Sequence, residues 1–305
     1  MTATALPQIQ SYGHILDADD DKIGEIRDSS DLAGDFDALR QRFKEDGYIL
    51  LRGFHDRELV LEARRNVTEK MEKDGILNPD FPTTEGVLKE GVETAFKPEY
   101  TKDNPAMMDV LYGERMIDFY TNFFEEEVRH YDYTWFRAVG KGKGTNPHCD
   151  LPYMGRGTHK HMTCWTPFGD ITYDIGGLII LENSQNRHDL TGNYMSRDVD
   201  GYCENKPSEV ERAKKEEWVF SGTLSRNPVM LRNKFSGRWL VSEYQMGDIL
   251  TFGMGMVHAS LDNQTNFARL SSDSRYQKAS EAIDDRWIGE NPPGHKWAGK
   301  RGRIC

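Results

Sequence analysis

Apolar residues recur at helical spacing in the first part of the chain. After Asp35, the apolar residues Phe36, Leu39 and Phe43 stand three and four positions apart, and Gly47 follows them. This spacing places the three side chains on one face of a helix, with Asp35 as its N-terminal cap and Gly47 as its end. The pattern therefore predicts an amphipathic helix, followed at once by an apolar strand over residues 48–51.

Two further segments show the same spacing. One runs from Asp56 to Gly75, with apolar residues at 60, 63, 67 and 71, and the other covers residues 114–128, with an aromatic stripe that includes Phe119 and Phe123. Such stripes are typical of surface helices that pack on a core, so these aromatic residues are better explained by packing than by a cofactor. We expect a second and a third helix here.

The pattern changes at Tyr131. From there, short β-like runs alternate with Gly, Pro, Asn and Asp residues. Strands are predicted over residues 131–139, 161–168, 176–182, 228–231, 238–244, 247–253 and 268–276. A helical region followed by many short strands predicts a mainly β protein with flanking helices, built as an antiparallel sandwich or barrel.

The distribution of polar, apolar and charged segments also suggests how the chain divides into regions. Residues 1–34 are polar and acidic and are expected to form an N-terminal arm. Residues 35–283 form one domain, with a helical region at 35–130 and a β core at 131–283 that contains a charge-rich insertion at about 184–239. The insertion is expected to hold a short helix, and the Gly/Pro-rich residues 284–305 to form an extended surface tail.

Composition limits the classes of partner. With 39 basic and 50 acidic side chains the net charge is −11, which repels nucleic acids. No apolar run is long enough to span a bilayer, and the first residues lack the features of a secretion signal, so we expect a soluble cytoplasmic protein. The four cysteines form no C-x-x-C pair and are expected to be free thiols: Cys149, Cys164, Cys203 and Cys305.

Two His-x-Asp triplets are candidates for half of a metal site. Residues i and i+2 of a strand project to the same side, so either His148 with Asp150 or His130 with Asp132 has suitable spacing. His130 ends the third predicted helix, where residues two apart do not face each other. His148 follows a glycine-rich loop between predicted strands, which favours the second triplet as the ligand pair and a structural role for His130.

A third ligand and an anion-binding residue come later in the chain. The strand predicted over 247–253 leads to His258, and two histidines with one carboxylate form the usual site of non-haem iron(II) oxygenases. In the last predicted strand, Arg269 points away from Ala268 and Leu270. A buried arginine requires an anion, and its guanidinium fits a carboxylate such as that of 2-oxoglutarate. The alternative is an ordinary surface ion pair.

These motifs together resemble the phytanoyl-CoA dioxygenase (PhyH) family of iron(II)- and 2-oxoglutarate-dependent oxygenases, over roughly residues 38–277. The resemblance rests on the segment FKEDGYILLRGF and then, in order, on His148-x-Asp150, Trp165, Gly247-Asp248-Ile249, His258-Ala-Ser260, Asn263 and Arg269. It implies a double-stranded β-helix (a cupin-like jelly roll) with iron on His148, Asp150 and His258. It also implies 2-oxoglutarate bound by Arg269, Ser260 and Trp165. Members often carry Gln where this chain has Cys149.

The resemblance further implies an O₂-dependent hydroxylation of an unactivated C–H bond of a small polar substrate, with release of succinate and CO₂. Halogenating relatives need a small residue where Asp150 stands, so hydroxylation is favoured. Four residues near the motifs are candidates for substrate recognition: Arg156, His159, His161 and Arg275. Two alternatives remain open, a cupin-type metal enzyme using His159 and His161 without 2-oxoglutarate, and a non-catalytic jelly roll. A homo-oligomer is also left open.

Overall fold

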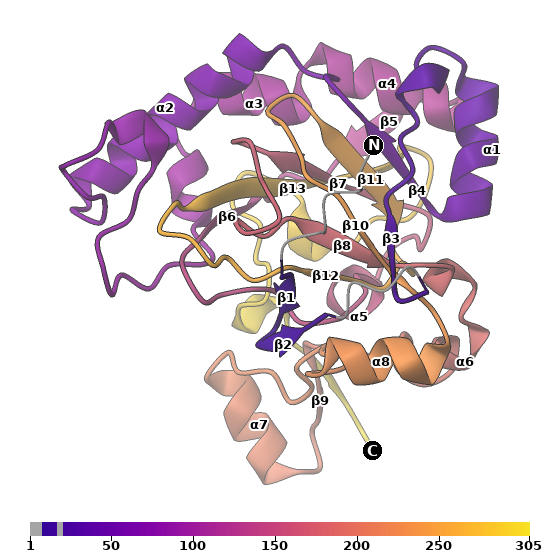
Figure 1. Cartoon of the computed structure of the whole chain (residues 1–305). Helices are drawn as coiled ribbons and strands as arrows, with labels where there is room; N and C mark the ends of the chain where they lie inside the picture. The colour runs from indigo at the N-terminus through magenta and orange to yellow at the C-terminus, as the bar shows by residue number, and fades with distance from the viewer. Residues whose placement is uncertain (1–7, 17–20) are drawn as a thin grey trace.

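Two β-sheets packed face to face form the centre of the molecule (Figure 1). The computed structural model describes residues 8–16 and 21–305. One sheet has the order β12-β8-β10-β3: β12 (His258–Ser260), β8 (Leu178–Leu181), β10 (Trp239–Val241) and β3 (Ile23–Glu25). The other has the order β4-β11-β7-β13-β5, with β6 also paired to β13: β4 (Tyr48–Leu51), β11 (Ile249–Gly253), β7 (Met162–Pro167), β13 (Arg269–Lys278), β5 (Val128–His130) and β6 (Trp135–Val139). The predicted β sandwich is confirmed.

Four helices cover the outer face of the larger sheet (Figure 1): α1 (Phe36–Asp46), α2 (Arg57–Lys73), α3 (Pro105–Tyr112) and α4 (Glu114–Phe124). The predicted caps of α1 are present, since the Asp35 carboxylate accepts from the backbone N–H of Ala38 at 3.0 Å and Gly47 has a φ of 77°. The third predicted helix ends at Phe124, because the chain then turns into β5. Helix α3 was not predicted.

The insertion and the two small sheets lie on the side of the sandwich away from helices α1 to α4 (Figure 1). They comprise β1 (Gln10–Ser11) with β2 (His14–Ile15), and β9 (Gly201–Cys203) with β14 (Arg301–Arg303), together with α6 (His188–Thr191), α7 (Pro207–Lys214) and α8 (Pro228–Phe235). The short helix expected in the insertion is confirmed as α7. The strand predicted over 228–231 is wrong, because Pro228 begins a helix whose first turn is capped by the Asn227 side chain.

The C-terminal segment is packed against the insertion, which corrects two expectations. Cys203 forms a disulfide with Cys305, so two of the four cysteines are not free thiols. Within residues 284–305, Arg286 and Trp287 are 2% and 1% exposed, so this segment is not simply an extended surface tail. Strand β14 pairs in parallel with β9, which brings the end of the chain beside the insertion.

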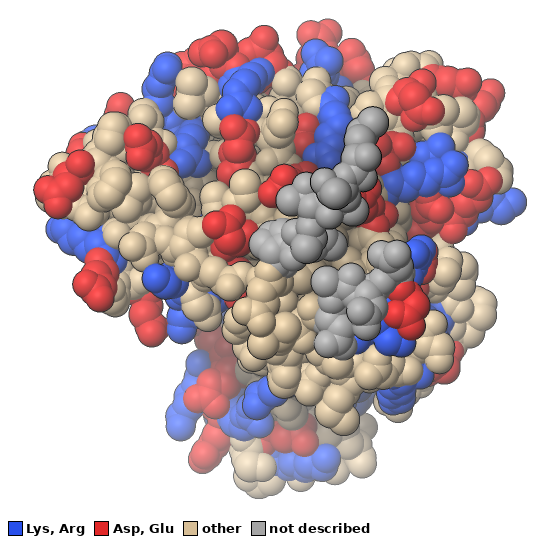
Figure 2. Space-filling view, viewed as in Figure 1, with Lys and Arg blue, Asp and Glu red and all other residues tan. Residues whose placement is uncertain are grey.

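Acidic and basic side chains are mixed on the face of the molecule in Figure 2, where red and blue groups alternate over the helices. Within residues 8–16 and 21–305, no helix has the length and apolar character needed to cross a membrane. The predicted arm at residues 1–34 lies partly outside the described residues.

Candidate metal centre

Three candidate ligands converge between the two sheets. Backbone hydrogen bonds in both directions pair His148 with His258, at 3.0 and 2.9 Å, and the N–H of Asp150 donates to the carbonyl of Met254 at 3.1 Å. The strand-like segment around His148 is thereby fixed beside β12. One ligand atom from each of His148, Asp150 and His258 lies within 4.8 Å of the others. In the described part of the chain, no other group of three such side chains is found.

Both imidazoles are held in the same tautomer. Nδ1 of His148 lies 2.8 Å from the carbonyl oxygen of Asn146, and Nδ1 of His258 lies 3.0 Å from that of Met256. A carbonyl only accepts, so each Nδ1 carries the proton and each Nε2 keeps a free lone pair for a metal ion. Burial, followed by the neighbouring His258, lowers the pKa of His148 to about 3, which keeps this ring neutral.

Asp150 is kept ionised by its neighbours. The Thr163 hydroxyl donates to Oδ2 of Asp150, and Nη2 of Arg275 lies 3.4 Å from the same oxygen. Burial acts to raise the pKa of Asp150, but the charge of Arg275 and the adjacent imidazoles outweigh it and leave the pKa below its usual value. Oδ1 makes no hydrogen bond with a described residue and lies 3.9 Å from Nε2 of His258. Two neutral imidazoles and one carboxylate are the donor set that suits iron(II).

The competing triplet does not form such a site. Nδ1 of His130 lies 2.9 Å from the carbonyl oxygen of Tyr131, and its ring centroid lies 4.4 Å from that of Tyr112. The carboxylate of Asp132 accepts from the backbone N–H of Gly289 at 2.6 Å. Both side chains therefore have structural contacts.

Arg269 lies in the same cavity as the three candidate ligands, and it is 2% exposed. Its Nη1 donates to the carbonyl oxygen of Gly176 at 2.7 Å, whereas its buried Nε has no hydrogen-bond partner among the described residues. No described carboxylate forms an ion pair with it, and burial lowers its pKa to about 10. A buried guanidinium with an unused donor fits a ligand carboxylate.

Ser260 and Trp165 line this cavity as well. Oγ of Ser260 accepts from the backbone N–H of Thr145 at 2.8 Å, so its own proton remains available to a ligand. Trp165 lies on β7 with its ring centroid 4.7 Å from that of Tyr244. The residues present thus fit both a divalent cation and a dicarboxylate beside it.

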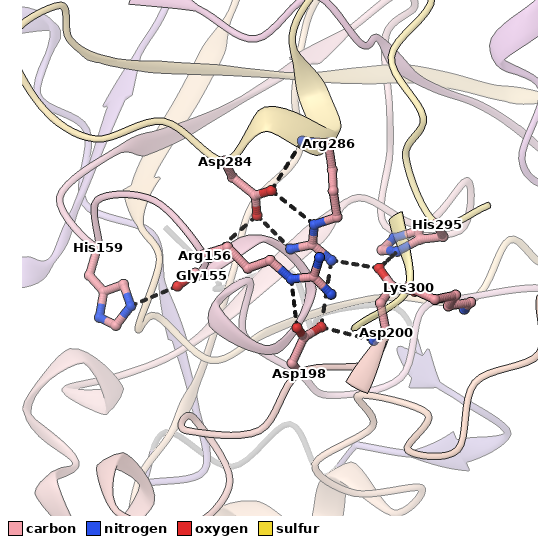
Figure 3. A network of polar contacts seen from close by, with 9 residues as sticks. All are labelled: Gly155, Arg156, His159, Asp198, Asp200, Asp284, Arg286, His295 and Lys300. Atoms are coloured by element: carbon pink, nitrogen blue, oxygen red, sulfur yellow. Dashed lines mark hydrogen bonds and ion pairs between the residues drawn. The ribbon is translucent and has the colours of Figure 1, made fainter. Parts of the chain in front are cut away.

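Of the four substrate candidates, only Arg275 reaches the cavity. His161 is buried behind it, with Nδ1 3.3 Å from the Tyr131 hydroxyl. Nε of Arg156 donates to Asp198 at 2.7 Å, and Nε2 of His159 lies 3.0 Å from the carbonyl oxygen of Gly155, both in the polar network of Figure 3. Arg156 and His159 are therefore not brought to the site.

Several lining residues were missed. Arg137, Asp273 and Thr145 contribute to the same cavity. Arg137 stands between buried apolar residues in β6. The reasoning that identified Arg269, a cation inside an apolar strand, would therefore also have identified Arg137. A larger adjoining cavity of about 720 Å³ shares His148, Asp150 and Arg275 with the first. Its outer wall comes from the insertion and the C-terminal segment, for which no sequence signal was available.

Cys149 faces away from the metal ligands. Its side chain packs in an apolar cluster with Ile179, Val257 and Ala259, and its backbone N–H donates to the Tyr194 hydroxyl at 3.2 Å. Burial raises the pKa of the thiol. Since neighbouring residues of an extended segment point to opposite sides, this placement follows from directing His148 and Asp150 at the cavity.

Comparison with known proteins agrees with this geometry. Residues 43–271 match the model of the family "Phytanoyl-CoA dioxygenase (PhyH)". The chain is 26% identical over 278 residues to the 1-deoxypentalenic acid 11-beta-hydroxylase of Streptomyces exfoliatus, which covers 85% of this chain and 87% of that protein.

Solved structures share the fold at low identity. The epimerase SnoN in complex with Fe³⁺, alpha ketoglutarate and nogalamycin RO has a TM-score of 0.56 at 15% identity, covering 85% of this chain and 93% of SnoN. EctD from S. alaskensis, with 2-oxoglutarate and 5-hydroxyectoine, has a TM-score of 0.55 at 14% identity, covering 92% of this chain and 91% of EctD. The predicted jelly roll is thereby confirmed. The chain belongs to the phytanoyl-CoA dioxygenase family of iron(II)- and 2-oxoglutarate-dependent oxygenases.

Proposed function

We propose that this protein hydroxylates an unactivated C–H bond of a small organic molecule, with iron(II) held by His148, Asp150 and His258. The observation that carries the proposal is the convergence of these side chains in one cavity with Arg269, a buried cation that has an unused donor and no carboxylate partner among the described residues. The hydroxylase of Streptomyces exfoliatus supports the reaction type. When bound, iron with 2-oxoglutarate and O₂ supplies the oxidation of the C–H bond and yields succinate and CO₂.

The residues of this chain hold and orient the reactants. The carbonyls of Asn146 and Met256 fix the two imidazoles with Nε2 toward the metal, and Thr163 fixes the carboxylate of Asp150. With iron bound, this carboxylate would be a ligand where halogenation needs room for a halide, which favours hydroxylation over halogenation.

The cosubstrate end of the cavity is assigned to three residues. Arg269 neutralises the distal carboxylate of 2-oxoglutarate through its guanidinium, and Ser260 donates its hydroxyl proton to the same carboxylate. Trp165, in edge-to-face contact with Tyr244, closes one side of the cavity and excludes water there. The cytoplasmic location, the homo-oligomer and the exclusion of nucleic-acid and membrane partners stay predictions.

An anaerobic titration tests the proposal. Iron(II) and 2-oxoglutarate added to the intact protein should give the weak visible charge-transfer band of the chelate. The band should be absent in His148→Ala, and Arg269→Ala should need a much higher 2-oxoglutarate concentration to produce it. His130→Gln, which alters the other triplet, serves as the matched control and should leave the band unchanged. No band with the intact protein overturns the proposal.

The alternative cupin-type site has no support in the geometry. His159 is exposed and His161 is fully buried, and the two rings have separate partners in the chain, Gly155 and Tyr131. They therefore do not present a pair of ligands to one metal ion.

A further inference from the structure

Six aromatic rings line the larger cavity, together with charged residues that include Glu216 and Lys296, and the metal ligands lie at its inner end. Its volume of about 720 Å³ lies within the roughly 300–1,000 Å³ typical of small-molecule sites. The rings come from the helical region, the β core, the insertion and the C-terminal segment: Phe96, Tyr133, Trp135, Tyr153, Trp218 and Trp287. We refer to this cavity as the aromatic chamber. Its walls favour an apolar molecule over the small polar substrate expected from the sequence.

The charges at the inner end of the chamber are already paired. The guanidinium of Arg275 lies 3.4 Å from Asp150 and 3.9 Å from Asp273, and it stacks over the Trp135 ring at 4.0 Å. Arg137 forms a close ion pair with Asp273. The two guanidinium groups and the two carboxylates of this set balance in formal charge, although Nε and Nη1 of the buried Arg275 have no hydrogen-bond partner among the described residues.

The outer end presents one oriented imidazole. The ring of His295 lines the chamber and lies 5.0 Å from Trp218, 4.9 Å from Trp287 and 6.3 Å from Tyr153, between centroids. The Tyr153 ring is in turn 5.6 Å from that of His148. A ligand that fills the chamber therefore extends from the metal ligands at one end to His295 at the other.

Asp200 fixes the tautomer of His295. Nδ1 of His295 lies 2.7 Å from Oδ2 of Asp200, which also accepts from Arg286 at 2.5 Å, while Oδ1 accepts from Lys300 at 2.8 Å (Figure 3). Burial acts to raise the pKa of Asp200, but the hydrogen bonds from His295 and Lys300 and the charge of Arg286 lower it to about 2. An ionised carboxylate only accepts, so Nδ1 of His295 carries the proton. In a ring that carries this one proton, Nε2 is an acceptor, and no described residue donates to it.

We propose that the aromatic chamber binds an apolar ring compound carrying a hydroxyl group, and that His295 positions it by accepting the hydroxyl proton at Nε2. This inference rests on the proposed function for the identity of the inner end. His295 acts as a specificity-determining residue, since it holds one end of the molecule while the C–H bond to be oxidised lies at the other. A carboxylate in place of the hydroxyl has no proton to donate and binds less well.

Two probes that share an apolar cage, one with a hydroxyl and one with a carboxylate, test the preference for a hydroxyl. Binding of 1-adamantanol and 1-adamantanecarboxylate to the full-length protein is measured at pH 8 by quenching of tryptophan fluorescence, because three of the six tryptophans line the chamber. The alcohol should bind at least about fivefold more tightly, as expected for one hydrogen bond. Equal or tighter binding of the carboxylate, or no binding of either probe, overturns the inference.

Variants of His295 separate recognition from packing. In His295→Asn the amide retains a donor toward Asp200 but does not reach the Nε2 position, so the preference for the alcohol should disappear while the fold is kept. His295→Gln, whose amide oxygen reaches that position, should keep part of the preference. His159→Ala removes an exposed histidine outside the chamber and should leave both affinities unchanged. An unchanged preference in His295→Asn, or the same loss in His159→Ala, also overturns the inference.

The same measurements distinguish this inference from the proposed function. If the protein gives the charge-transfer band but binds the two probes equally, the role of His295 is rejected and the proposed function stands. A preference that depends on His295, in a protein that gives no charge-transfer band, removes the iron and 2-oxoglutarate chemistry alone.

Discussion

Two clusters of buried polar groups lie at opposite ends of the aromatic chamber, and they differ in how far their charges are satisfied. The inner cluster, around Asp150, holds two imidazoles whose Nδ1 atoms face backbone carbonyls, and Arg269, which forms no ion pair with a described carboxylate. The outer cluster, around Asp200, is balanced in charge, with three carboxylates against three cations: Asp198, Asp200 and Asp284 with Arg156, Arg286 and Lys300 (Figure 3). A buried charge without a counter-charge indicates a ligand, whereas ions that pair with one another indicate a structural role for those ions.

Removal of the inner carboxylate should have the largest effect on activity. Asp150→Ala deletes one of three metal ligands, so succinate formation driven by iron(II) and 2-oxoglutarate should fall to background. Stability should fall as well, because the buried Arg275 loses its ion pair with Asp150 at 3.4 Å.

The matched control for this change is Asp132→Asn, in the other His-x-Asp triplet. The amide keeps an oxygen to accept from Gly289, so activity should stay within about twofold of the intact protein. Equal losses in the two variants would contradict the assignment of the ligands.

Removal of Asp200, the outer carboxylate, should affect stability more than the metal site. Asp200→Asn leaves Lys300 buried without its counter-charge and removes one of the carboxylates around Arg286, and breaking one side of such a pair typically costs about 3–5 kcal/mol. The free energy of unfolding, measured with urea, should fall by about that amount, while the folded fraction still forms the charge-transfer band. Asp189→Asn, at an exposed pair with Arg187, should cost less than about 1 kcal/mol.

The inner cluster was accessible from the sequence because its signals are local. His148 and Asp150 share one side of an extended segment, and Arg269 stands between Ala268 and Leu270, so spacing together with the local strand context indicated them. The outer cluster joins residues about a hundred positions apart, as Asp200 with Lys300 and Cys203 with Cys305, and no local pattern indicates such contacts.

The errors in secondary structure have a different origin. The run PVML is apolar and short, and such a run does not distinguish a strand from a buried helix. The discriminating signal was Asn227 followed by Pro228, a cap and a first-turn proline, which marks the start of α8. Helix α1 was predicted correctly because Asp35 and Gly47 gave that kind of signal at both of its ends.

Acid should destabilise the central part of the molecule before the outer cluster. His55 is 5% exposed, and burial lowers its pKa from 6.5 to about 4. The unfolded chain therefore binds a proton at this residue between pH 6.5 and 4 while the folded chain does not, which lowers stability by up to about 3 kcal/mol across that window. The pKa of Asp200 is lowered from 3.8 to about 2, so its contribution is fully present above pH 3.8 and is lost only as the pH falls toward 2.

Urea unfolding at a series of pH values checks this order. His55→Gln should make the decline between pH 6.5 and 4 shallower, with the remainder due to the buried His148 and His161, whose pKa values are lowered to about 3, whereas Asp200→Asn should leave the slope of that decline unchanged. A decline that disappears in Asp200→Asn would place the acid sensitivity in the outer cluster instead.

The smallest expected effect comes from a residue that supports a ligand without touching the metal. Thr163→Val removes the hydroxyl that donates to Oδ2 of Asp150 while keeping the volume of the side chain. Loss of such a supporting hydrogen bond typically weakens metal affinity by about 10- to 100-fold, which anaerobic iron(II) titration would measure. Thr172→Val, at an exposed threonine paired with Asp174, is the matched control and should not change the affinity. If Thr163→Val instead lowers the free energy of unfolding and leaves the iron(II) affinity unchanged, then packing alone holds Asp150 in place. The inner cluster would in that case resemble the outer one, whose ions have a structural role.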